Sequence, residues 1–469
     1  LPREQAHALL VVLLLERIVW RFNQGTDISD TMANACLNAV GRIKQLVGDQ
    51  SCKTSGHRLR VLISAYACEP GKGSEPGVGW NWVRQIVRFH EVWVVTRENN
   101  REDIERRLEK EPMPNVHWIY FDLPRWASFW KRGQRGVHLY YYLWQIGVYI
   151  VSRRLQKKVQ FDLAHHITFG IYWMPSFLAF LPVPFIWGPV GGGESTPKEL
   201  LSTFEFRGKV YEHIRHLARW LCEKDPFVRL TIRGANAALA KAHETAVRLK
   251  ALGCREVQVY PESGISNDEL PSLKTAPVRN SNSFRLLSIG RQIYWKGFHL
   301  GIIAFAKMQR EFPESEYWLI GNGPQQRNLK RLAEKLGVTK KVRFLGHLPR
   351  QNVLENLVEC NVLVHPSLHD SGGWVCLEAM AAGRPVICLD LGGPALQVTD
   401  KVGIKVPAKS PEQTVDDLAA AMTWLARNPE LRIQMGEAAH QRVAEDFNWN
   451  KKGEWVNMIY QQTLFKHEK

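Results

Sequence analysis

Two carboxylates in the stretch HDSGGWVCLEAMAAGRPVI (residues 369–387) are placed to bind a hydroxylated ligand. Every residue from Trp374 to Ala382 is apolar except Glu378, and Asp370 precedes Glu378 across a Ser-Gly-Gly turn. Burying an unpaired carboxylate is costly. Glu378 therefore has a structural partner, such as a buried arginine or a helix end, or it accepts hydrogen bonds from the hydroxyl groups of a ligand such as a sugar.

The turn between the two acids favours an anion. Ser371, Gly372 and Gly373 allow a ligand to approach the backbone closely, and the helix predicted to follow begins with unbonded amides. These amides and the helix dipole suit a diphosphate. The stretch therefore fits a ligand that carries both a diphosphate and a sugar.

Two other loops in the carboxyl-terminal half fit the same ligand. The stretch SIGRQIYWKGF supplies Gly290, Arg291 and Lys296, and an arginine fork with a lysine point charge binds phosphates well. A solvated basic loop would have the same composition. The stretch GNGP supplies Gly321 and Gly323 where a predicted strand leads into a helix, whose N-terminus favours anions.

Glycine-rich loops also follow predicted strands in the amino-terminal half. The stretch ACEPGKGSEPGVGWNW contains Glu75, Gly77 and Gly79 but no Gly-Lys-Ser/Thr, so it is not a Walker phosphate loop. The stretch GPVGGGE contains Gly191 and Gly192. Their glycines permit close backbone approach, while the acid could contact a ligand or simply be solvated.

A pair of histidines also lies at the end of a predicted strand. The stretch FDLAHHIT places His165 and His166 at the end of a predicted strand, the edge where α/β proteins bind ligands. Strand parity decides which of them faces a cleft, and we favour His166. A packed histidine with satisfied hydrogen bonds is an equal alternative for each.

These loops are connected by elements of a regular pattern. Short apolar, β-rich runs alternate with helical stretches, which predicts parallel sheets covered by helices on both faces. The runs are residues 60–66, 91–97, 116–123, 161–168, 183–190, 237–242 and 257–262, and then residues 284–290, 316–323, 341–348, 361–367, 384–390 and 403–407. We predict an α/β chain with two doubly wound Rossmann-like domains that face a central cleft.

The domain boundaries follow from this alternation and from the polar stretch PSLKTAPVRNSNS that interrupts it. We expect an amino-terminal domain at 58–278, a carboxyl-terminal domain at 279–446 and a terminal helix at 447–469. Residues 1–57 form a helical extension of unknown role. Its apolar run ALLVVLLL is shorter than the roughly 20 residues that span a bilayer and lacks a signal-peptide cleavage site, so an amphipathic or core helix is expected.

The stretches GRQIYWKG, GNGP, FLGHLP and the acid-x7-acid element ending in LEAMAAGRPVI have an order and spacing that resemble a family 4 (group 1) glycosyltransferase, a retaining enzyme with the GT-B architecture. The resemblance covers most of residues 58–460. It implies that Arg291 and Lys296 bind the diphosphate of a nucleotide-sugar and that Glu378 binds its ribose. It also implies that Asp370, where the family usually has Glu, contacts the sugar.

The resemblance assigns the other candidates as well. The donor site would comprise Gly290, Arg291, Lys296, Gly321, Gly323, Asp370, Ser371, Gly372, Gly373, Leu377 and Glu378. The catalytic residues would be His166, His165, Asp370, Arg291 and Lys296, and the acceptor site would comprise Glu75, Gly77, Gly79, Gly191 and Gly192. The terminal helix would cross back to the amino-terminal domain.

The resemblance further implies retention of configuration and chemistry without a metal ion. The chain has no Asp-x-Asp, the carboxylate pair that holds a divalent ion in other transferases. We expect no cofactor, only a nucleotide-sugar co-substrate whose base (uridine, guanosine or adenosine) stays open.

The composition limits the partners. With 45% hydrophobic and 23% charged residues the chain is globular, and its formal charge of +16 indicates an anionic partner. Residues 125–158 contain no acid and mix basic with aromatic side chains, which favours an anionic membrane surface over an ordinary amphipathic helix and over nucleic acid. Scattered cysteines without a Cys-x-x-Cys pair indicate reduced thiols. We expect a cytoplasmic protein, peripheral at the inner face of the membrane, with no nucleic-acid partner.

The sequence thus predicts the transfer of a sugar from a nucleotide-sugar to a glycan or lipid-linked acceptor. One alternative is a nucleotide-sugar-binding scaffold or sensor at the membrane without transferase activity, suggested by Asp370 in the first acidic position. Another is a phosphorylase of similar architecture, for which the sequence offers no pyridoxal-phosphate motif.

Overall fold

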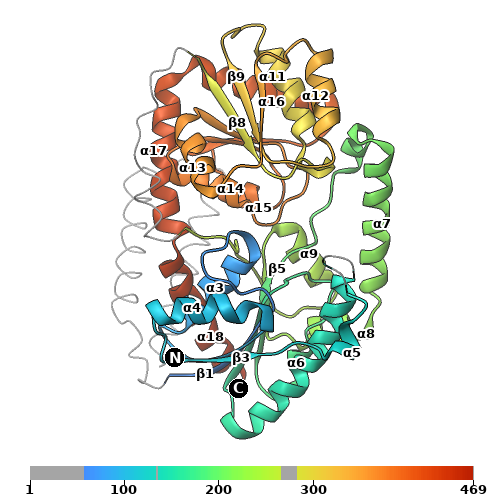
Figure 1. The fold of residues 1–469 in the computed structure, drawn as a ribbon, viewed down its shortest axis with the longest axis vertical. Coiled ribbons are helices and arrows are strands. Elements are labelled where there is room, and N and C mark those ends of the chain that lie inside the picture. The colour runs from blue at the N-terminus through green and yellow to red at the C-terminus, as the bar shows by residue number, and fades with distance from the viewer. Residues whose placement is uncertain (1–57, 132, 134–135, 266–282, 468–469) are drawn as a thin grey trace, which may run out of the picture. The chain divides into compact units, whose positions relative to one another are not determined.

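The computed structural model describes residues 58–131, 133, 136–265 and 283–467. The helical extension expected at residues 1–57 and most of the predicted linker lie outside this range. Two parallel sheets, one from each half of the chain, form the described fold (Figure 1). This confirms the predicted α/β architecture with two doubly wound sheets.

The sheet of the amino-terminal half has the strand order β3-β2-β1-β4-β5-β6-β7, and all its described pairings are parallel. Its strands are β1 (Arg60–Ala65), β2 (Glu91–Thr96), β3 (Val116–Tyr120), β4 (Leu163–Thr168), β5 (Phe185–Val190), β6 (Ala237–Ala240) and β7 (Val257–Val259). Its helices are α3 (Ser74–Ile86), α4 (Arg101–Lys110), α5 (Arg125–Ser128), α6 (Val137–Val159), α7 (Phe206–Cys222), α8 (Pro226–Gly234) and α9 (His243–Ala251), with 3-10 turns η1 (Glu98–Asn100), η2 (Phe177–Phe180) and η3 (Lys198–Thr203).

The sheet of the carboxyl-terminal half has the order β10-β9-β8-β11-β12-β13, again with parallel pairings. Its strands are β8 (Arg285–Ile289), β9 (Glu316–Ile320), β10 (Val342–Gly346), β11 (Val362–His365), β12 (Val386–Leu389) and β13 (Gly403–Val406). The other elements are the 3-10 turn η4 (Tyr294–Lys296) and helices α11 (Phe298–Met308), α12 (Gln326–Lys335), α13 (Arg350–Glu359), α14 (Trp374–Ala381), α15 (Gly392–Gln397), α16 (Pro411–Arg427), α17 (Pro429–Asp446) and α18 (Trp449–His467).

Each sheet has a point where the strand order reverses, between β1 and β4 in the first and between β8 and β11 in the second. Loops that leave adjacent strands at such a point turn to opposite faces and open a crevice at the carboxyl ends of the strands. Glu75 lies in the first turn of α3, directly after the loop that follows β1, and Lys296 lies in the loop that follows β8. The topology therefore aims both loops at crevices.

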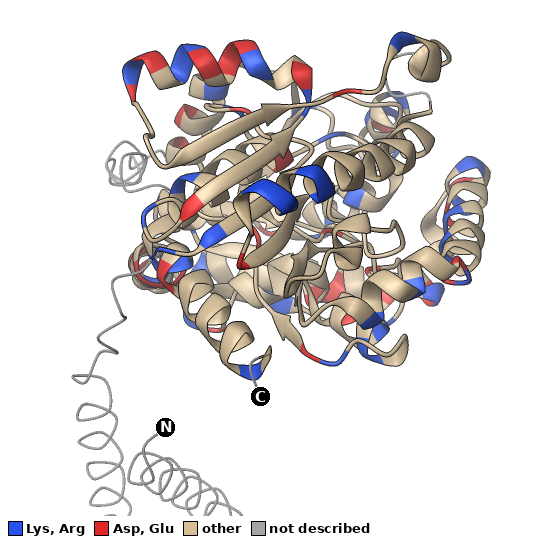
Figure 2. Cartoon of the chain, turned by 90° about the horizontal axis from the view of Figure 1, so that it is seen from below, with Lys and Arg blue, Asp and Glu red and all other residues tan. Residues whose placement is uncertain are grey.

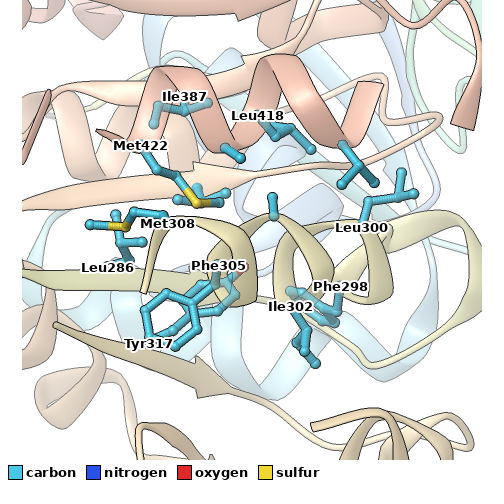
Figure 3. Close-up of a cluster of buried hydrophobic side chains, with 14 of the residues drawn as sticks. Leu286, Phe298, Leu300, Ile302, Phe305, Met308, Tyr317, Ile387, Leu418 and Met422 are labelled. Atoms are coloured by element: carbon cyan, nitrogen blue, oxygen red, sulfur yellow. The ribbon is translucent and has the colours of Figure 1, made fainter. Parts of the chain in front are cut away.

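Apolar packing holds these strands in place. In the carboxyl-terminal half, α11 and α16 pack over the sheet, and Figure 3 shows Phe305 and Met308 of α11 between Leu286 and Tyr317 of the strands and Met422 of α16. All five side chains are at most 2% exposed. Burying a side chain of this size contributes about 1.5–3 kcal/mol, so this core fixes where the loop after β8 begins.

The last helix, α18, packs against the amino-terminal half, although α17 before it belongs to the carboxyl-terminal half (Figure 1). Trp449 at its start contacts Trp82 of α3, with ring centroids 6.0 Å apart. Tyr460 lies 2.7 Å through its hydroxyl from His165 of β4. The helix thus ties the end of the chain to the first sheet.

The basic and aromatic stretch at residues 125–158 is only partly at the surface. Tyr140, Tyr141 and Trp144 of α6 are buried in the core, whereas Trp126 and Phe129 are 80% and 78% exposed. This corrects the view of α6 as a membrane-facing aromatic helix, because its apolar side is needed to cover the sheet. Lys and Arg residues are spread over many elements, interspersed with acids on α4 (Figure 2). No helix among the described residues is long and apolar enough to cross a bilayer.

Candidate active site

A cavity of about 710 Å3 is lined by loops at the carboxyl ends of the strands of both sheets. The first half contributes Ser74, Glu75, Gly170, Ile171, Gly191, Gly192, Glu194, Arg215, Lys241 and Glu262. The second half contributes Ile289, Gly290, Arg291, Trp295, Lys296, His369, Asp370, Ser371, Gly372, Gly373, Trp374, Val375 and Glu378. The volume is in the range of pockets that enclose a small organic ligand.

Lys296 and Asp370 meet in this cavity, although they come from two different motifs. The Lys296 ammonium group contacts Asp370 Oδ2 directly. Lys296 lies in the loop after β8 and Asp370 in the loop after β11, so the pair spans the switch point of the second sheet. Gly297 has φ +66°, and a Cβ atom there would lie 1.9 Å from the carbonyl oxygen of Pro366, so glycine is needed for the two loops to meet.

Asp370 is held by four donors. Besides Lys296, His365 Nε2 lies 3.1 Å from Oδ2, and the amides of Gly372 and Gly373 each donate to Oδ1 at 3.2 Å. Burial alone would raise the pKa of Asp370, but Lys296 and the hydrogen bond from His365 outweigh it and hold that pKa well below its usual range. The two glycine amides expected to be unbonded at the start of α14 are thus already bonded to Asp370.

Arg291 differs from Lys296 in its surroundings. It is exposed at the cavity edge, and among the described residues its guanidinium group is within bonding distance of no acid. An exposed guanidinium group beside an open cavity is suited to bind a phosphate in a bidentate manner. Arg291 and Lys296 together place two positive charges on the loop after β8.

Glu378 both lines the cavity and has a structural partner. It lies on α14 with 6% of its surface exposed, and its Oε1 contacts Arg350 of α13. The Arg350 side chain is 51% exposed, so the pair lies at the boundary of protein and solvent rather than deep in the core. The two interpretations of Glu378, structural pairing and ligand binding, are therefore compatible.

Three other predicted donor residues support the site without lining it. A Cβ atom at Gly321 would lie 2.0 Å from the carbonyl oxygen of Gly290, and one at Gly323 would lie 2.2 Å from that of Gln292. These glycines let the loop after β9 pack against the loop that contains Arg291. Leu377 is fully buried in the apolar cluster beneath α14.

Some of the predicted acceptor residues line the cavity and others do not. Glu75, Gly191 and Gly192 line the cavity, and Glu75 Oε1 accepts a hydrogen bond of 3.1 Å from the Gly170 amide. Gly77 and Gly79 do not line it. A Cβ atom at Gly77 would lie 1.9 Å from the carbonyl oxygen of Lys72. A Cβ atom at Gly79 would lie 2.1 Å from the carbonyl oxygen of Ala67. Both glycines lie in α3 and let this helix pack closely against the loop after β1.

The histidine expectation needs a correction, because His165 and His166 lie within β4 and neither lines the cavity. His165 bonds to Tyr460 and, at 2.7 Å, to the carbonyl oxygen of Gly188, while His166 bonds to Tyr141 at 3.0 Å. Burial lowers the pKa of His165 to about 4 and that of His166 to about 3, so both are neutral at pH 7. β4 continues to Thr168, and side chains inside a strand point to the helix-covered faces of the sheet rather than to its edge.

Sequence reasoning missed a buried ion pair on the cavity wall. Lys241 directly follows β6 and Glu262 follows β7, and Lys241 Nζ lies 2.5 Å from Glu262 Oε2. Burial alone would lower the pKa of Lys241, but Glu262 outweighs it and raises that pKa, so the lysine stays charged. Both strands were predicted, and the rule that ligands bind at carboxyl ends of strands could have identified both residues.

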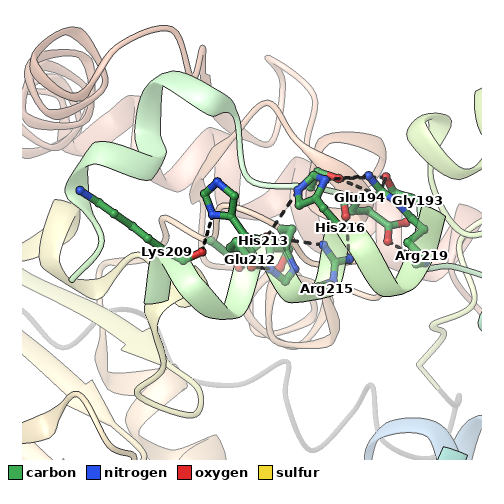
Figure 4. A network of polar contacts seen from close by, with 12 residues as sticks. Gly193, Glu194, Lys209, Glu212, His213, Arg215, His216 and Arg219 are labelled. Atoms are coloured by element: carbon green, nitrogen blue, oxygen red, sulfur yellow. Dashed lines mark hydrogen bonds and ion pairs between the residues drawn. The ribbon is translucent and has the colours of Figure 1, made fainter. Parts of the chain in front are cut away.

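Helix α7 supplies one cavity residue that the sequence analysis did not identify, Arg215, and supports others. Figure 4 shows Arg215 and Arg219 of this helix beside Glu194 and Gly193. Arg215 Nη2 donates to the carbonyl oxygen of Glu194 at 2.7 Å, and Arg219 Nη1 donates to that of Gly193 at 3.2 Å. The helix thereby supports the glycine-rich turn after β5.

The same helix reaches the carboxyl-terminal half. Glu212 Oε1 lies 3.0 Å from His369 Nε2, and the ring of Tyr211 stacks on Trp295 with centroids 5.1 Å apart. Trp295 in turn stacks on His369 at 5.1 Å. Both Trp295 and His369 line the cavity. Among the described residues, no group of three or more His, Cys, Asp or Glu side chains could hold a metal ion.

Comparison with solved structures defines the class of fold. The sucrose-phosphate synthase of Thermosynechococcus elongatus superposes with a TM-score of 0.59 at 17% identity, covering 87% of this chain and 100% of that one. HepE of Anabaena, solved with UDP and glucose, superposes with a TM-score of 0.57 at 17% identity, covering 86% and 100%. The described fold is GT-B, with two Rossmann-like sheets.

Sequence comparison finds a family match in the carboxyl-terminal half. Residues 271–442 match the family described as glycosyl transferases group 1. The glycogen synthase of Mycobacterium tuberculosis is 30% identical over 47% of this chain and 52% of its own length. D-inositol 3-phosphate glycosyltransferase of Kribbella flavida is 33% identical over 39% and 44%. The chain thus spans about half the length of the curated relatives it matches. The predicted resemblance to group 1 glycosyltransferases is confirmed.

Proposed function

We propose that this protein transfers a sugar from a nucleotide-sugar to a glycan or lipid-linked acceptor, with retention of configuration and without a metal ion. One observation carries the proposal. Arg291, Lys296, Asp370 and Glu378, drawn from two separated motifs, line the same cavity, whose other wall is built by acids and cations of the first sheet. The group 1 match over residues 271–442 supports it.

The donor would lie against the carboxyl-terminal half. Arg291 and Lys296 would bind the diphosphate, because two cations on one loop offset its charge. Glu378 would accept hydrogen bonds from the ribose hydroxyl groups. Uridine is the first base to test, since HepE was solved with UDP.

The transfer step follows from this placement. An acceptor hydroxyl oxygen attacks the anomeric carbon on the face from which the diphosphate leaves, so a new glycosidic bond forms as the bond to phosphate oxygen breaks. The hydroxyl proton passes to the departing diphosphate. Arg291 and Lys296 stabilise the negative charge that develops on the leaving group, and Asp370 orients Lys296 toward the cavity.

The acceptor would lie against the amino-terminal half. Glu75, Glu194 and Glu262 line this wall together with Arg215 and Lys241. Carboxylates beside cations form a polar surface that suits the hydroxyl groups of a glycan, because each oxygen can accept a hydrogen bond. A position at the inner face of the membrane belongs to the same proposal, since it would bring a lipid-linked acceptor to this wall.

The proposal is tested by calorimetric binding of UDP, GDP and ADP and by transfer assays with UDP-glucose. We expect one nucleotide to bind, and Glu378→Gln to weaken it about tenfold to a hundredfold, the loss of a charge-assisted hydrogen bond. Glu355→Gln, an exposed carboxylate on α13, is the matched control and should leave binding unchanged. Binding of none of the three nucleotides would contradict the proposal.

The scaffold alternative is favoured by one observation. Asp370 is already engaged by four donors, which leaves little capacity for a sugar hydroxyl. A scaffold would bind the nucleotide-sugar but would release no nucleotide. Slow hydrolysis of UDP-glucose by the purified protein, measured as UDP release and abolished in Lys296→Met, would exclude the scaffold.

A further inference from the structure

Helix α7 presents its polar side to the protein and its apolar side to solvent, the reverse of an ordinary surface helix. The exposed large apolar side chains are Phe206, Val210, Tyr211, Ile214, Leu217, Trp220 and Leu221 of α7 and Phe227 and Leu230 of α8. We call these nine residues the α7–α8 apolar face. Five of them, at positions 206, 210, 214, 217 and 221, recur every three or four residues and so form one stripe along the helix.

The reversed orientation has a clear cause on the inner side. Glu212, Arg215 and Arg219 follow the same helical spacing and bond to His369, Glu194 and Gly193 around the cavity (Figure 4). The helix cannot turn its apolar stripe inward without breaking these contacts. These inner contacts therefore hold the apolar side chains at the surface, where Phe206 is 79% and Ile214 60% exposed.

The fully exposed charged side chains within residues 206–234 are all cationic. Residues 206–234 contain three acids, and none of them is fully exposed: Glu212 and Glu223 are buried, and Asp225 caps α8 through the Phe227 amide. Arg207, Lys224 and Arg233 are exposed. Glu205, just before α7, is bonded to Asn328.

We propose that the α7–α8 apolar face docks on a lipid surface with anionic headgroups. The face combines apolar side chains, including a tryptophan and a tyrosine, with cations at its edge. This combination suits the boundary between the headgroups and the acyl chains of a membrane. Two copies of this face would bring like charges together. Residues 1–57 carry six Lys and Arg and five Asp and Glu, so they offer no excess of negative charge to cover it.

Docking at this face would bring the lipid surface close to the cavity. Tyr211, a member of the face, stacks on Trp295, and Glu212 on the inner side of α7 bonds to His369; both Trp295 and His369 line the cavity. The docking inference does not depend on sugar transfer, because its test measures vesicle binding alone.

The test is sedimentation of the full chain with vesicles of phosphatidylcholine alone and of phosphatidylcholine with an equal amount of phosphatidylglycerol. We expect binding to the anionic vesicles that weakens with salt. The double variant Ile214→Ser and Leu217→Ser should bind about tenfold or more weakly. The matched control is Ile433→Ser with Met458→Ser, because these side chains are similarly exposed, 57% and 46%, on α17 and α18; it should bind like the wild type.

A second pair of variants tests the charges. Lys224→Gln and Arg233→Gln should each weaken binding to anionic vesicles by about fivefold. Equal vesicle binding by the wild type and the Ile214→Ser, Leu217→Ser variant would overturn the proposal, as would absence of vesicle binding. A wild-type dimer in analytical ultracentrifugation that this variant converts to monomer would also overturn it, since the face would then be a self-contact. If that variant unfolds, Phe206→Ser at the first turn of α7 takes its place.

Discussion

The two walls of the cavity are built differently. The donor wall comes from two loops at one switch point, and its central pair, Lys296 and Asp370, joins them. The acceptor wall is assembled from the ends of several strands and from α7, with the ion pair of Lys241 and Glu262 at its centre. A short motif can therefore identify the donor wall, whereas no single stretch of sequence describes the acceptor wall.

The difference has a functional meaning under the proposed activity. A diphosphate and a ribose are the same in every nucleotide-sugar, so one compact set of charges suffices to bind them. Acceptors differ in shape, and a wall built from separate loops can vary at single positions between related proteins without disturbing the rest of the wall. The predictions below test whether the two walls are independent.

The largest effect is expected from removing Lys241, the buried cation of the acceptor wall. Lys241→Met leaves Glu262 buried and unpaired, which should lower the free energy of unfolding by about 3–5 kcal/mol. The double variant Lys241→Met, Glu262→Leu should recover most of the loss in urea unfolding. Nucleotide affinity of the double variant should equal that of the wild type. A loss below about 1 kcal/mol in the single variant would show that water reaches the pair.

Removing Lys296 from the donor wall should lower the rate of transfer and leave acceptor binding unchanged. Lys296→Met withdraws a charge from the leaving diphosphate and should reduce the transfer rate about a hundredfold to a thousandfold. Lys307→Met on α11, which removes an exposed lysine paired with Asp416, is the control and should leave the rate unchanged. If both variants have the same rate, the donor does not lie against the loop after β8.

The histidines inside β4 should make stability depend on pH without affecting the site. Their folded pKa values of about 4 and about 3 lie below the unfolded value near 6.5. The unfolded chain therefore takes up protons first as the pH falls, and each histidine should lower the free energy of unfolding by about 2 kcal/mol between pH 7 and pH 5. In His165→Gln the glutamine amide can still donate to Gly188. Urea unfolding of this variant should show a loss of unfolding free energy between pH 7 and pH 5 that is about 2 kcal/mol smaller than in the wild type.

The smallest effects should come from two glycines, Gly321 behind the donor wall and Gly191 in the acceptor wall. Gly321→Ala places a Cβ atom 2.0 Å from a backbone oxygen of the donor wall at φ +119°, and should destabilise the fold by about 1–3 kcal/mol. In Gly191→Ala the nearest atoms to the added Cβ belong to the side chains of Lys241 and Ser371, at 3.1 Å, and the change should cost less than about 1 kcal/mol. Thermal unfolding of both variants measures the difference, and the reverse order would contradict the described packing.

Much of this molecule can be predicted from its local patterns. The runs of apolar residues coincide with the strands of both sheets, because a buried parallel strand must be apolar on both faces. The glycines and charges around Arg291, Lys296 and Asp370 identify the loops after β8 and β11, because a loop that binds anions needs those residue types close together. These features depend on neighbours in sequence, so the sequence by itself determined them.

Other features were decided only by tertiary structure. The continuation of β4 to Thr168 turned His165 and His166 toward helices α18 and α6, because direction in a strand depends on where the strand ends. The pairing of Lys241 with Glu262 needs β6 and β7 to be neighbours in the sheet. The outward apolar face of α7 needs its polar side to be held at the cavity. In each case the deciding contact joins residues far apart in the chain, and only the folded arrangement of the elements brings such residues together.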